Sequence, residues 1–193
     1  MNDNHFIRGR IPMTKSEVRA IVLAKLELQE DSIVYDIGAG TGSVAVEAAL
    51  SVRQGRVYAI EQKEEGCELI RRNQEALGAE NLTVVCGLAP EALEDLPVPD
   101  RVFVGGSGGR LAEILDQVRK KNPRVRLVIT VIALETLTAV GEYLKERSLK
   151  AEIVSVQIAR AEKCGSYHLM QGQNPVYIVT IPDMVQEREP CCM

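Results

Sequence analysis

The stretch "VYDIGAGTG", residues 34–42, decides the fold of this chain. It places three glycines at alternate positions, Gly38, Gly40 and Gly42, with the acidic Asp36 just before them. An apolar run precedes the glycines, and the helix-like stretch "SVAVEAALSV" follows them. One glycine in this place would indicate only a tight turn. Three alternating glycines between a buried strand and a helix instead predict a turn whose backbone lies against a ligand.

Outward from this turn, apolar strands alternate with helices. The pattern predicts strands over 32–38, 56–61, 81–87, 100–106 and 125–132, and helices over 14–28, 42–51, 64–77, near 90–95, 109–120 and 134–147. Strands separated in this way form a parallel sheet with helices on both faces, so the predicted class is α/β. Thr14 and Glu17 have the spacing of a capping box at the start of the first helix.

The C-terminal part breaks this alternation. Two strands are predicted over 150–161 and 174–182 with no helix between them. A hairpin-like pair would add an antiparallel strand to the sheet, which then has seven strands. The connection "EKCGSYHLMQGQ", residues 162–173, is expected to be a long loop that is functional or lies at an interface.

The composition narrows the class of protein. The 193 residues suffice for one well-buried domain, and the net charge of −4 with 4% aromatic residues counts against a nucleic-acid partner. The start has no signal pattern, and no apolar run approaches about 18 residues, so we expect a cytoplasmic protein without membrane contact. None of the five cysteines forms a C-x-x-C pair. They are expected to be reduced thiols, and no metal site is predicted.

The spacing of the glycines distinguishes between nucleotide ligands. The dinucleotide fingerprint G-x-G-x-x-G requires glycine at position 43, where this chain has Ser43. The observed G-x-G-x-G suits a ligand with an amino-acid portion better than a pyrophosphate. Glu61 ends the second strand and could bind both hydroxyls of a ribose, or be a solvated strand end. Gly87, Leu88 and Ala89 follow the third strand and could flank an adenine, or form an ordinary turn of small residues.

Together these features resemble the class I S-adenosylmethionine-dependent methyltransferases, whose Rossmann-like sheet has an antiparallel seventh strand. The stretches that narrow the resemblance are "IPMTKSEVRA" (11–20), "FVGGSGG" (103–109), "ALE" (133–135) and "ARAEKCGSYHLMQGQNPVYIVT" (159–180). In combination they are similar to the CbiT family, the decarboxylating corrin-ring methyltransferases of cobalamin biosynthesis, over nearly the whole chain. Relatives tend to have Asn where this chain has Thr130.

The resemblance implies one catalytic domain over 1–193, with an N-terminal entry segment and helix over 1–30. We expect residues 183–193 to form a mobile tail, for which the family offers no counterpart. The resemblance also implies S-adenosylmethionine as the cofactor and a tetrapyrrole as the substrate. The implied reaction methylates a ring-bridging carbon, carbon 15, of a cobalt-precorrin or precorrin of the 6B or 6Y type, and removes carbon dioxide from a ring acetate. The implied assembly is a homotetramer.

The site residues follow from the motifs and the resemblance. Those expected to bind the cofactor are Thr14, Gly38, Ala39, Gly40, Thr41, Gly42, Glu61, Gly87, Leu88 and Ala89. A substrate edged with carboxylates calls for cationic partners and a turn that a flat ring can approach. Its candidate contacts are Arg8, Arg10, Lys15, Gly105, Gly106, Ser107 and Arg160, although any one of these charges could simply be solvated. No catalytic residue is assigned, because the ring itself supplies a carbon nucleophile; His168 could be a proton donor or a structural histidine.

Two other functions stay open. One is a tRNA or protein methyltransferase on the same fold, and the acidic balance with few aromatics counts against the nucleic-acid version. The other is a non-catalytic nucleotide-binding or NAD-dependent module, against which the serine at position 43 counts.

Overall fold

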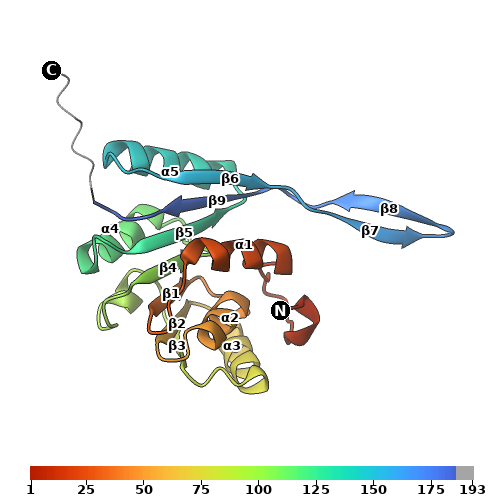
Figure 1. The fold of residues 1–193 in the computed structure, drawn as a ribbon, viewed down its shortest axis with the longest axis horizontal. Helices are drawn as coiled ribbons and strands as arrows, with labels where there is room; N and C mark the ends of the chain where they lie inside the picture. Colours follow the sequence, from red (N-terminus) through yellow and green to blue (C-terminus); the bar gives the residue numbers. More distant parts are fainter. Residues whose placement is uncertain (186–193) are drawn as a thin grey trace.

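The computed structural model of the protein describes residues 1–185. Its central sheet has seven strands in the order β3-β2-β1-β4-β5-β9-β6 (Figure 1). The strands of this sheet are β1 Ile33–Ile37, β2 Arg56–Glu61, β3 Leu82–Cys86, β4 Arg101–Val104, β5 Arg126–Val131, β6 Glu152–Val156 and β9 Val176–Ile181. Strand β9 runs antiparallel to both of its neighbours, β5 and β6. The mostly parallel sheet with one antiparallel strand is therefore confirmed.

The helices lie close to their predicted positions. They are α1 Ser16–Leu26, α2 Ser43–Ser51, α3 Glu64–Leu77, α4 Leu111–Lys121 and α5 Leu134–Glu146, with short 3-10 helices η1 Asp3–His5 and η2 Glu91–Leu93. The sequence analysis did not predict η1. In residues 1–185 no helix is both long and apolar enough to cross a membrane.

Alternation along the strands sends side chains to the two faces of the sheet, where they form three hydrophobic clusters among the described residues. Tyr35 and Ile37 of β1 pack in the core that includes α4 and α5. Val34 lies in the core that includes α2 and α3, and Phe103 of β4 packs with α1. Because successive strand residues point to opposite faces, helices cover both sides of the sheet (Figure 1).

The order of the strands positions the functional site. Strand β1 pairs with β2 on one side and with β4 on the other, so the chain moves outward to β3 and then crosses back to β4. Ligands of open parallel sheets bind at the carboxyl ends of the strands beside such a reversal. The glycine turn that follows β1 lies at this point.

The expectation of one strand over 150–161 followed by a loop over 162–173 is wrong, because β6 ends at Val156 and a separate two-stranded sheet begins at Ala159. Strands β7 Ala159–Cys164 and β8 Tyr167–Gly172 form an antiparallel hairpin that projects from the sheet as an arm (Figure 1). Cys164 pairs with Tyr167 around the two-residue turn Gly165–Ser166, and Gly165 has a φ of +63°. A Gly-Ser pair between two short runs is a recognised hairpin signal, which the sequence analysis overlooked.

Two smaller expectations also change. The capping box at α1 does not form. The N-cap residue is Lys15, whose ammonium group cannot accept a hydrogen bond from the helix, and the Glu17 carboxylate binds Arg160. At the other end, Met184 is buried and its amide donates to the carbonyl of Pro123, so packed structure extends beyond residue 182. The rest of the predicted tail, residues 186–193, lies outside the described residues.

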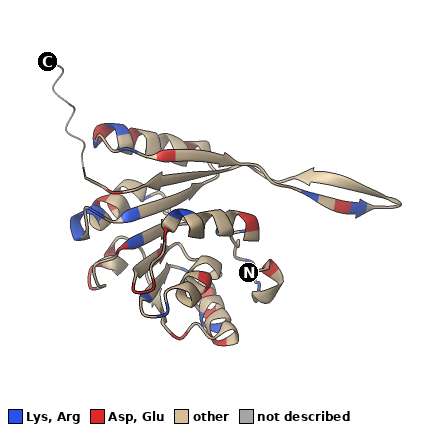
Figure 2. Cartoon of the chain, in the orientation of Figure 1, with Lys and Arg blue, Asp and Glu red and all other residues tan. Residues whose placement is uncertain are grey.

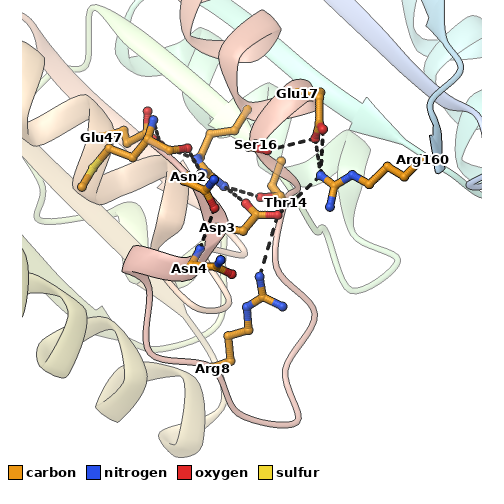
Figure 3. Close-up of polar contacts among 11 residues, drawn as sticks. Asn2, Asp3, Asn4, Arg8, Thr14, Ser16, Glu17, Glu47 and Arg160 are labelled. Atoms are coloured by element: carbon orange, nitrogen blue, oxygen red, sulfur yellow. Dashed lines mark hydrogen bonds and ion pairs between the residues drawn. The ribbon is translucent and has the colours of Figure 1, made fainter. Parts of the chain in front are cut away.

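A buried arginine fastens the N-terminus to the domain. Arg19 of α1 is completely buried and donates to Asp3 Oδ1 at 3.1 Å and to Glu47 Oε1 at 2.5 Å. It also donates to the carbonyl oxygens of Thr14 at 2.6 Å and Met1 at 2.8 Å. Figure 3 shows three of the partners of Arg19, namely Asp3, Thr14 and Glu47. One guanidinium therefore holds the first residues, the entry segment and α2 together.

We predict that Arg19→Ala lowers the free energy of unfolding by about 3–5 kcal/mol, because it leaves the Asp3 and Glu47 carboxylates without their shared cation. Urea unfolding followed by circular dichroism measures this change. Arg72→Ala is the matched control, because Arg72 is an exposed arginine of α3, and its effect should stay within about 0.5 kcal/mol. An Arg19→Ala protein as stable as the control would show that this network does not hold the fold.

Candidate active site

A cavity of about 390 Å³ opens at the carboxyl ends of the parallel strands. Its size falls within the range of small-molecule sites. The predicted cofactor residues that line it are Thr14, Gly38, Ala39, Gly40, Glu61, Gly87, Leu88 and Ala89, and the predicted substrate residues are Lys15, Gly105, Gly106 and Ser107. The two sets, which come from five separate parts of the sequence, therefore share one cavity.

The remaining predicted residues lie elsewhere. Arg8, Arg10 and Arg160 do not line the cavity, and neither do Thr41 and Gly42. Arg160 donates to Glu17 at 2.6 and 2.8 Å, and this pairing lowers the pKa of Glu17 to about 2 (Figure 3). Arg8 lies 3.9 Å from Asp3.

The three glycines of the turn have left-handed backbone conformations but different surroundings. A Cβ on Gly38, where φ is +73°, would lie 2.4 Å from the carbonyl oxygen of Gly106, so the turns after β1 and β4 are in direct contact. A Cβ on Gly40 would lie 3.1 Å from the carbonyl oxygen of Pro12. A Cβ on Gly42 would lie 2.9 Å from Ile70. Gly38 and Gly40 thus face neighbouring walls of the cavity, whereas Gly42 packs against α3.

Glu61 fixes the position of the glycine turn. Its carboxylate is buried, and Oε2 accepts from the Gly40 amide while Oε1 accepts from the Lys63 amide, both at 2.9 Å. Gly66 makes room for it, since a Cβ there would lie 2.6 Å from Glu61 Cγ. Each carboxylate oxygen has a second lone pair that can accept a further hydrogen bond. The binding of ribose hydroxyls by Glu61 therefore stays a prediction, in addition to its structural role in the glycine turn.

Asp36 lies buried below the turn, and no group within the described residues 1–185 donates a hydrogen bond of normal geometry to either carboxylate oxygen. Burial raises the pKa of Asp36 to about 7, an effect that the nearby Ala45 amide opposes and the negative charge of Glu61 reinforces. Alternation along β1 directs this side chain to the face covered by α2.

Several lining residues were absent from the prediction. They are Ile11, Pro12, Met13, Val18, Ile37, Ile60, Gln62, Lys63, Ile114, Ile132, Ile158, Gln173, Asn174 and Val176. Gly108, in the glycine-rich turn after β4, and Thr130, noted in the sequence, also line the cavity. Gln173 and Asn174 join the wall because the Gln173 amide donates to the carbonyl of Ile158 at 2.8 Å, which closes the base of the arm. The motif that contains Asn174 was noted in the sequence, but its pattern carried no information about where the base of the arm would lie.

Two of the cysteines depart from expectation, whereas Cys164 is a free thiol. Cys67 of α3 and Cys86 of β3 form a disulfide, with 6.0 Å between their Cα atoms. Reduced thiols were expected for both. The sequence offers no signal for this pair, because the two cysteines are 19 positions apart and meet only when α3 packs beside β3.

We predict that Asp36→Asn changes how stability depends on pH. The folded-state pKa of about 7 exceeds the ordinary value of 3.8, so the stability that protonated Asp36 contributes is lost as pH rises from about 4 to about 7. The asparagine does not titrate. As the pH rises from 5 to 8, the free energy of unfolding of the variant should therefore increase by roughly 2–3 kcal/mol relative to that of the parent.

Urea unfolding of the two proteins without ligand, at both pH values, measures the difference. Asp31→Asn is the matched control, because Asp31 is exposed. A difference between Asp36→Asn and its parent that is the same at pH 5 and pH 8 would contradict the raised pKa.

Comparison with known proteins identifies the family. The family described as "Precorrin methyltransferase domain" matches residues 6–182. A Pyrobaculum calidifontis protein named probable cobalt-precorrin-6B C(15)-methyltransferase (decarboxylating) is 44% identical over 172 residues, which are 88% of each chain. A Salmonella typhi protein named cobalt-precorrin-6B C(15)-methyltransferase (decarboxylating) is 36% identical, over 93% of this chain and 94% of that one.

Solved structures agree. A precorrin-6y C5,15-methyltransferase of Geobacter metallireducens superposes with a TM-score of 0.87 and is 40% identical, over 93% of this chain and 96% of that one. The structure of a Methanobacterium thermoautotrophicum protein titled precorrin 8W decarboxylase gives a TM-score of 0.88 at 35% identity, over 94% and 98% of the two chains. A tRNA methyltransferase of Aquifex aeolicus, at 15% identity and a TM-score of 0.74, over 91% and 71% of the two chains, shares the fold alone. The chain belongs to the precorrin methyltransferase family, as its sequence motifs predicted.

Proposed function

We propose that this enzyme transfers a methyl group from S-adenosylmethionine to carbon 15 of a cobalt-precorrin or precorrin of the 6B or 6Y type. The same reaction releases carbon dioxide from a ring acetate, in cobalamin biosynthesis. The observation that carries the proposal is the single cavity in which the glycine turn after β1 and the glycine turn after β4 face the same space. One turn suits the cofactor and the other suits a flat ring.

The residues around the β1 turn fit S-adenosylmethionine. Gly38 and Gly40 line the cavity with their backbone, and Glu61 keeps free lone pairs for ribose hydroxyls. Leu88 is 43% exposed at the cavity and offers an apolar surface to an adenine. The carboxyl of Asp36 below the turn favours a cation above it when ionised. When bound, this cofactor supplies an electrophilic methyl group.

The other side of the cavity fits a macrocycle with carboxylates. Gly105 and Gly106 present backbone, and Ser107 offers a hydroxyl. Lys15 lines the cavity, and within residues 1–185 its ammonium has no ion-pair partner, so it can pair with a substrate carboxylate. Arg160 is a weaker candidate than its sequence position indicated, because Glu17 already binds its guanidinium.

The chain's own contribution to the reaction is orientation. The cavity walls hold the two ligands side by side and exclude water, and the electron-rich ring carbon needs no protein nucleophile. The proposal therefore assigns no side chain as acid, base or nucleophile. The proposed enzyme works in the cytoplasm as one domain over 1–193, with 1–30 as its entry segment and helix, and without a nucleic-acid partner.

We also propose that the enzyme is a homotetramer and that the arm contacts a neighbouring subunit. Tyr167, Leu169 and Met170 of β8 are 73%, 54% and 67% exposed. Strand β8 carries no Lys, Arg, Asp or Glu (Figure 2). A two-stranded hairpin with exposed apolar side chains is marginally stable in water by itself, and contact with another chain would bury these side chains.

The activity is tested with S-adenosylmethionine and cobalt-precorrin-6B or its metal-free form. Mass spectrometry should find a product that has gained one methyl group and lost one carbon dioxide. Glu61→Ala should weaken S-adenosylmethionine binding in calorimetry by roughly tenfold or more, because hydrogen bonds to the ribose and to the Gly40 amide are lost. Glu75→Ala changes an exposed glutamate of α3 and should bind within about twofold of the parent.

Two outcomes would contradict this function. Methylation of tRNA or protein without any change in precorrin would favour the first alternative. Binding of NAD in place of S-adenosylmethionine would favour a nucleotide-binding module. If Glu61→Ala binds S-adenosylmethionine as tightly as the parent does, the ribose is not bound by Glu61 at the end of β2.

The assembly is tested by shortening the arm. Ala161 pairs with Met170, so Asn-Gly in place of residues 162–169 keeps the register and provides a turn that suits a hairpin. Light scattering should show loss of the tetramer, while calorimetry shows unchanged S-adenosylmethionine binding, because the replaced residues do not line the cavity. A shortened protein that is still tetrameric, or a parent that is monomeric, would refute the role of the arm.

A further inference from the structure

The disulfide between Cys67 and Cys86 lies directly behind the cofactor side of the cavity. We propose that these two cysteines form a reversible thiol–disulfide site that sets the affinity of the cavity for the cofactor. The link to affinity rests on the proposed binding of S-adenosylmethionine, whereas formation of the disulfide does not depend on it.

The two cysteines have the placement that reversible exchange requires. The Cα atoms are 6.0 Å apart, within the usual range for a disulfide. Cys86 is exposed and accessible to a small reagent, whereas Cys67 is fully buried beside it. An accessible thiol that reacts first and a buried thiol that completes the bond are therefore both present.

The disulfide spans the backbone of Glu61. Cys86 pairs with Glu61 in the β2–β3 register, and the next residue, Gly87, donates its amide to the Glu61 carbonyl at 3.0 Å. Cys67 Sγ lies 3.3 Å from the same carbonyl oxygen. On the other side of Cys67, Gly66 packs against the Glu61 side chain. The Cys67 sulfur and the Cys86 backbone thus border the residue that fixes the glycine turn.

The bond joins two walls of the cavity. Glu61 and Lys63 line it from the segment that leads into α3, and Gly87 and Ala89 line it from the segment after β3. Without the bond, these segments are held together by backbone hydrogen bonds and side-chain packing. With the bond, the first turn of α3 cannot move away from the end of β3, so these wall segments lose less conformational freedom when a ligand binds.

The exchange can start at Cys86. The Arg71 guanidinium donates a hydrogen bond to Cys86 Sγ at 3.1 Å, a contact that stabilises a thiolate, although Glu64 also binds Arg71 at 3.3 Å. The Cys86 thiolate attacks one sulfur of a low-molecular-weight disulfide such as oxidised glutathione, and one thiolate leaves. Cys67 then attacks the mixed disulfide, the second thiolate leaves, and the Cys67 proton goes to it. Two protein thiols are oxidised, and one small disulfide is reduced to two thiols.

The test uses the full chain with Cys164→Ser, Cys191→Ser and Cys192→Ser, so that the pair alone can react. The protein is equilibrated with glutathione and oxidised glutathione at several ratios, alkylated and analysed by mass spectrometry. We expect loss of both alkylation sites together as the ratio becomes oxidising, and recovery on reversal. The oxidised form should melt roughly 5–10 °C higher than the reduced form, because the bond closes a loop in the unfolded chain.

Calorimetry with S-adenosylhomocysteine then compares the two forms. The oxidised form should bind roughly 2- to 10-fold more tightly. In the same background, Cys86→Ser should bind like the reduced form under both redox conditions. The matched control retains Cys67 and Cys86 and changes Cys164 alone; its binding should respond to redox state.

Three results would overturn the proposal. One is a pair that stays fully alkylated, or fully bonded, at every ratio. Another is equal affinity of the oxidised and reduced forms for S-adenosylhomocysteine, which would contradict the redox proposal but not the proposed function. If neither form binds S-adenosylhomocysteine, the redox proposal and the proposed function are both contradicted. The third is a result in which one equivalent of zinc protects Cys67 and Cys86 from alkylation. That result would make Glu64, Cys67 and Cys86 a metal site instead.

Discussion

The contact between two glycine turns is the constraint on which the site depends. The backbone of Gly38, after β1, approaches Gly106, after β4, so closely that a side chain on Gly38 would overlap the carbonyl oxygen. This contact is available only where the strand order reverses, because β1 and β4 are neighbours in the sheet but far apart in the chain. It brings the proposed cofactor turn and the proposed substrate turn to one cavity, which neither turn could form alone.

Carboxylates then hold the surrounding segments in place. Glu61 accepts the amides of Gly40 and Lys63 and so ties the glycine turn to the start of α3. Asp3 and Glu47 share buried Arg19, which also binds the carbonyl of Thr14 in the entry segment. The same Asp3 lies 3.8 Å from Arg160 at the base of the arm (Figure 3). The arm, the N-terminus and the cavity wall therefore meet in one network of charges.

This arrangement suits a reaction in which the protein orients ligands and supplies little chemistry of its own. The cavity is lined by backbone, apolar side chains and a few polar groups, and Lys15 brings a cation to it. Family membership and the proposed reaction agree with such a site, because both reacting groups come with the ligands. Redox control at Cys67 and Cys86 would act on the walls of this site and leave the chemistry itself unchanged.

The sequence by itself determined the sheet, most helices and the centre of the cofactor side. Apolar periodicity located β2 over Arg56–Glu61 and α3 over Glu64–Leu77 at their observed bounds, because burial imposes a local repeat on each element. The glycine spacing and Glu61 were recognisable because they serve the site from short, contiguous segments. Family motifs supplied Thr14 and the turn after β4.

Only the tertiary structure decided which distant residues meet. The packing role of Gly42, the pairing of Arg160 with Glu17, the Cys67–Cys86 bond and the place of Gln173 in the wall all depend on contacts between segments far apart in the chain. Sequence patterns within one helix or strand carry no information about such contacts, because these residues fit their own helix or strand whether or not the distant partner is present. The sheet order and the side-chain alternation along each strand select the partner.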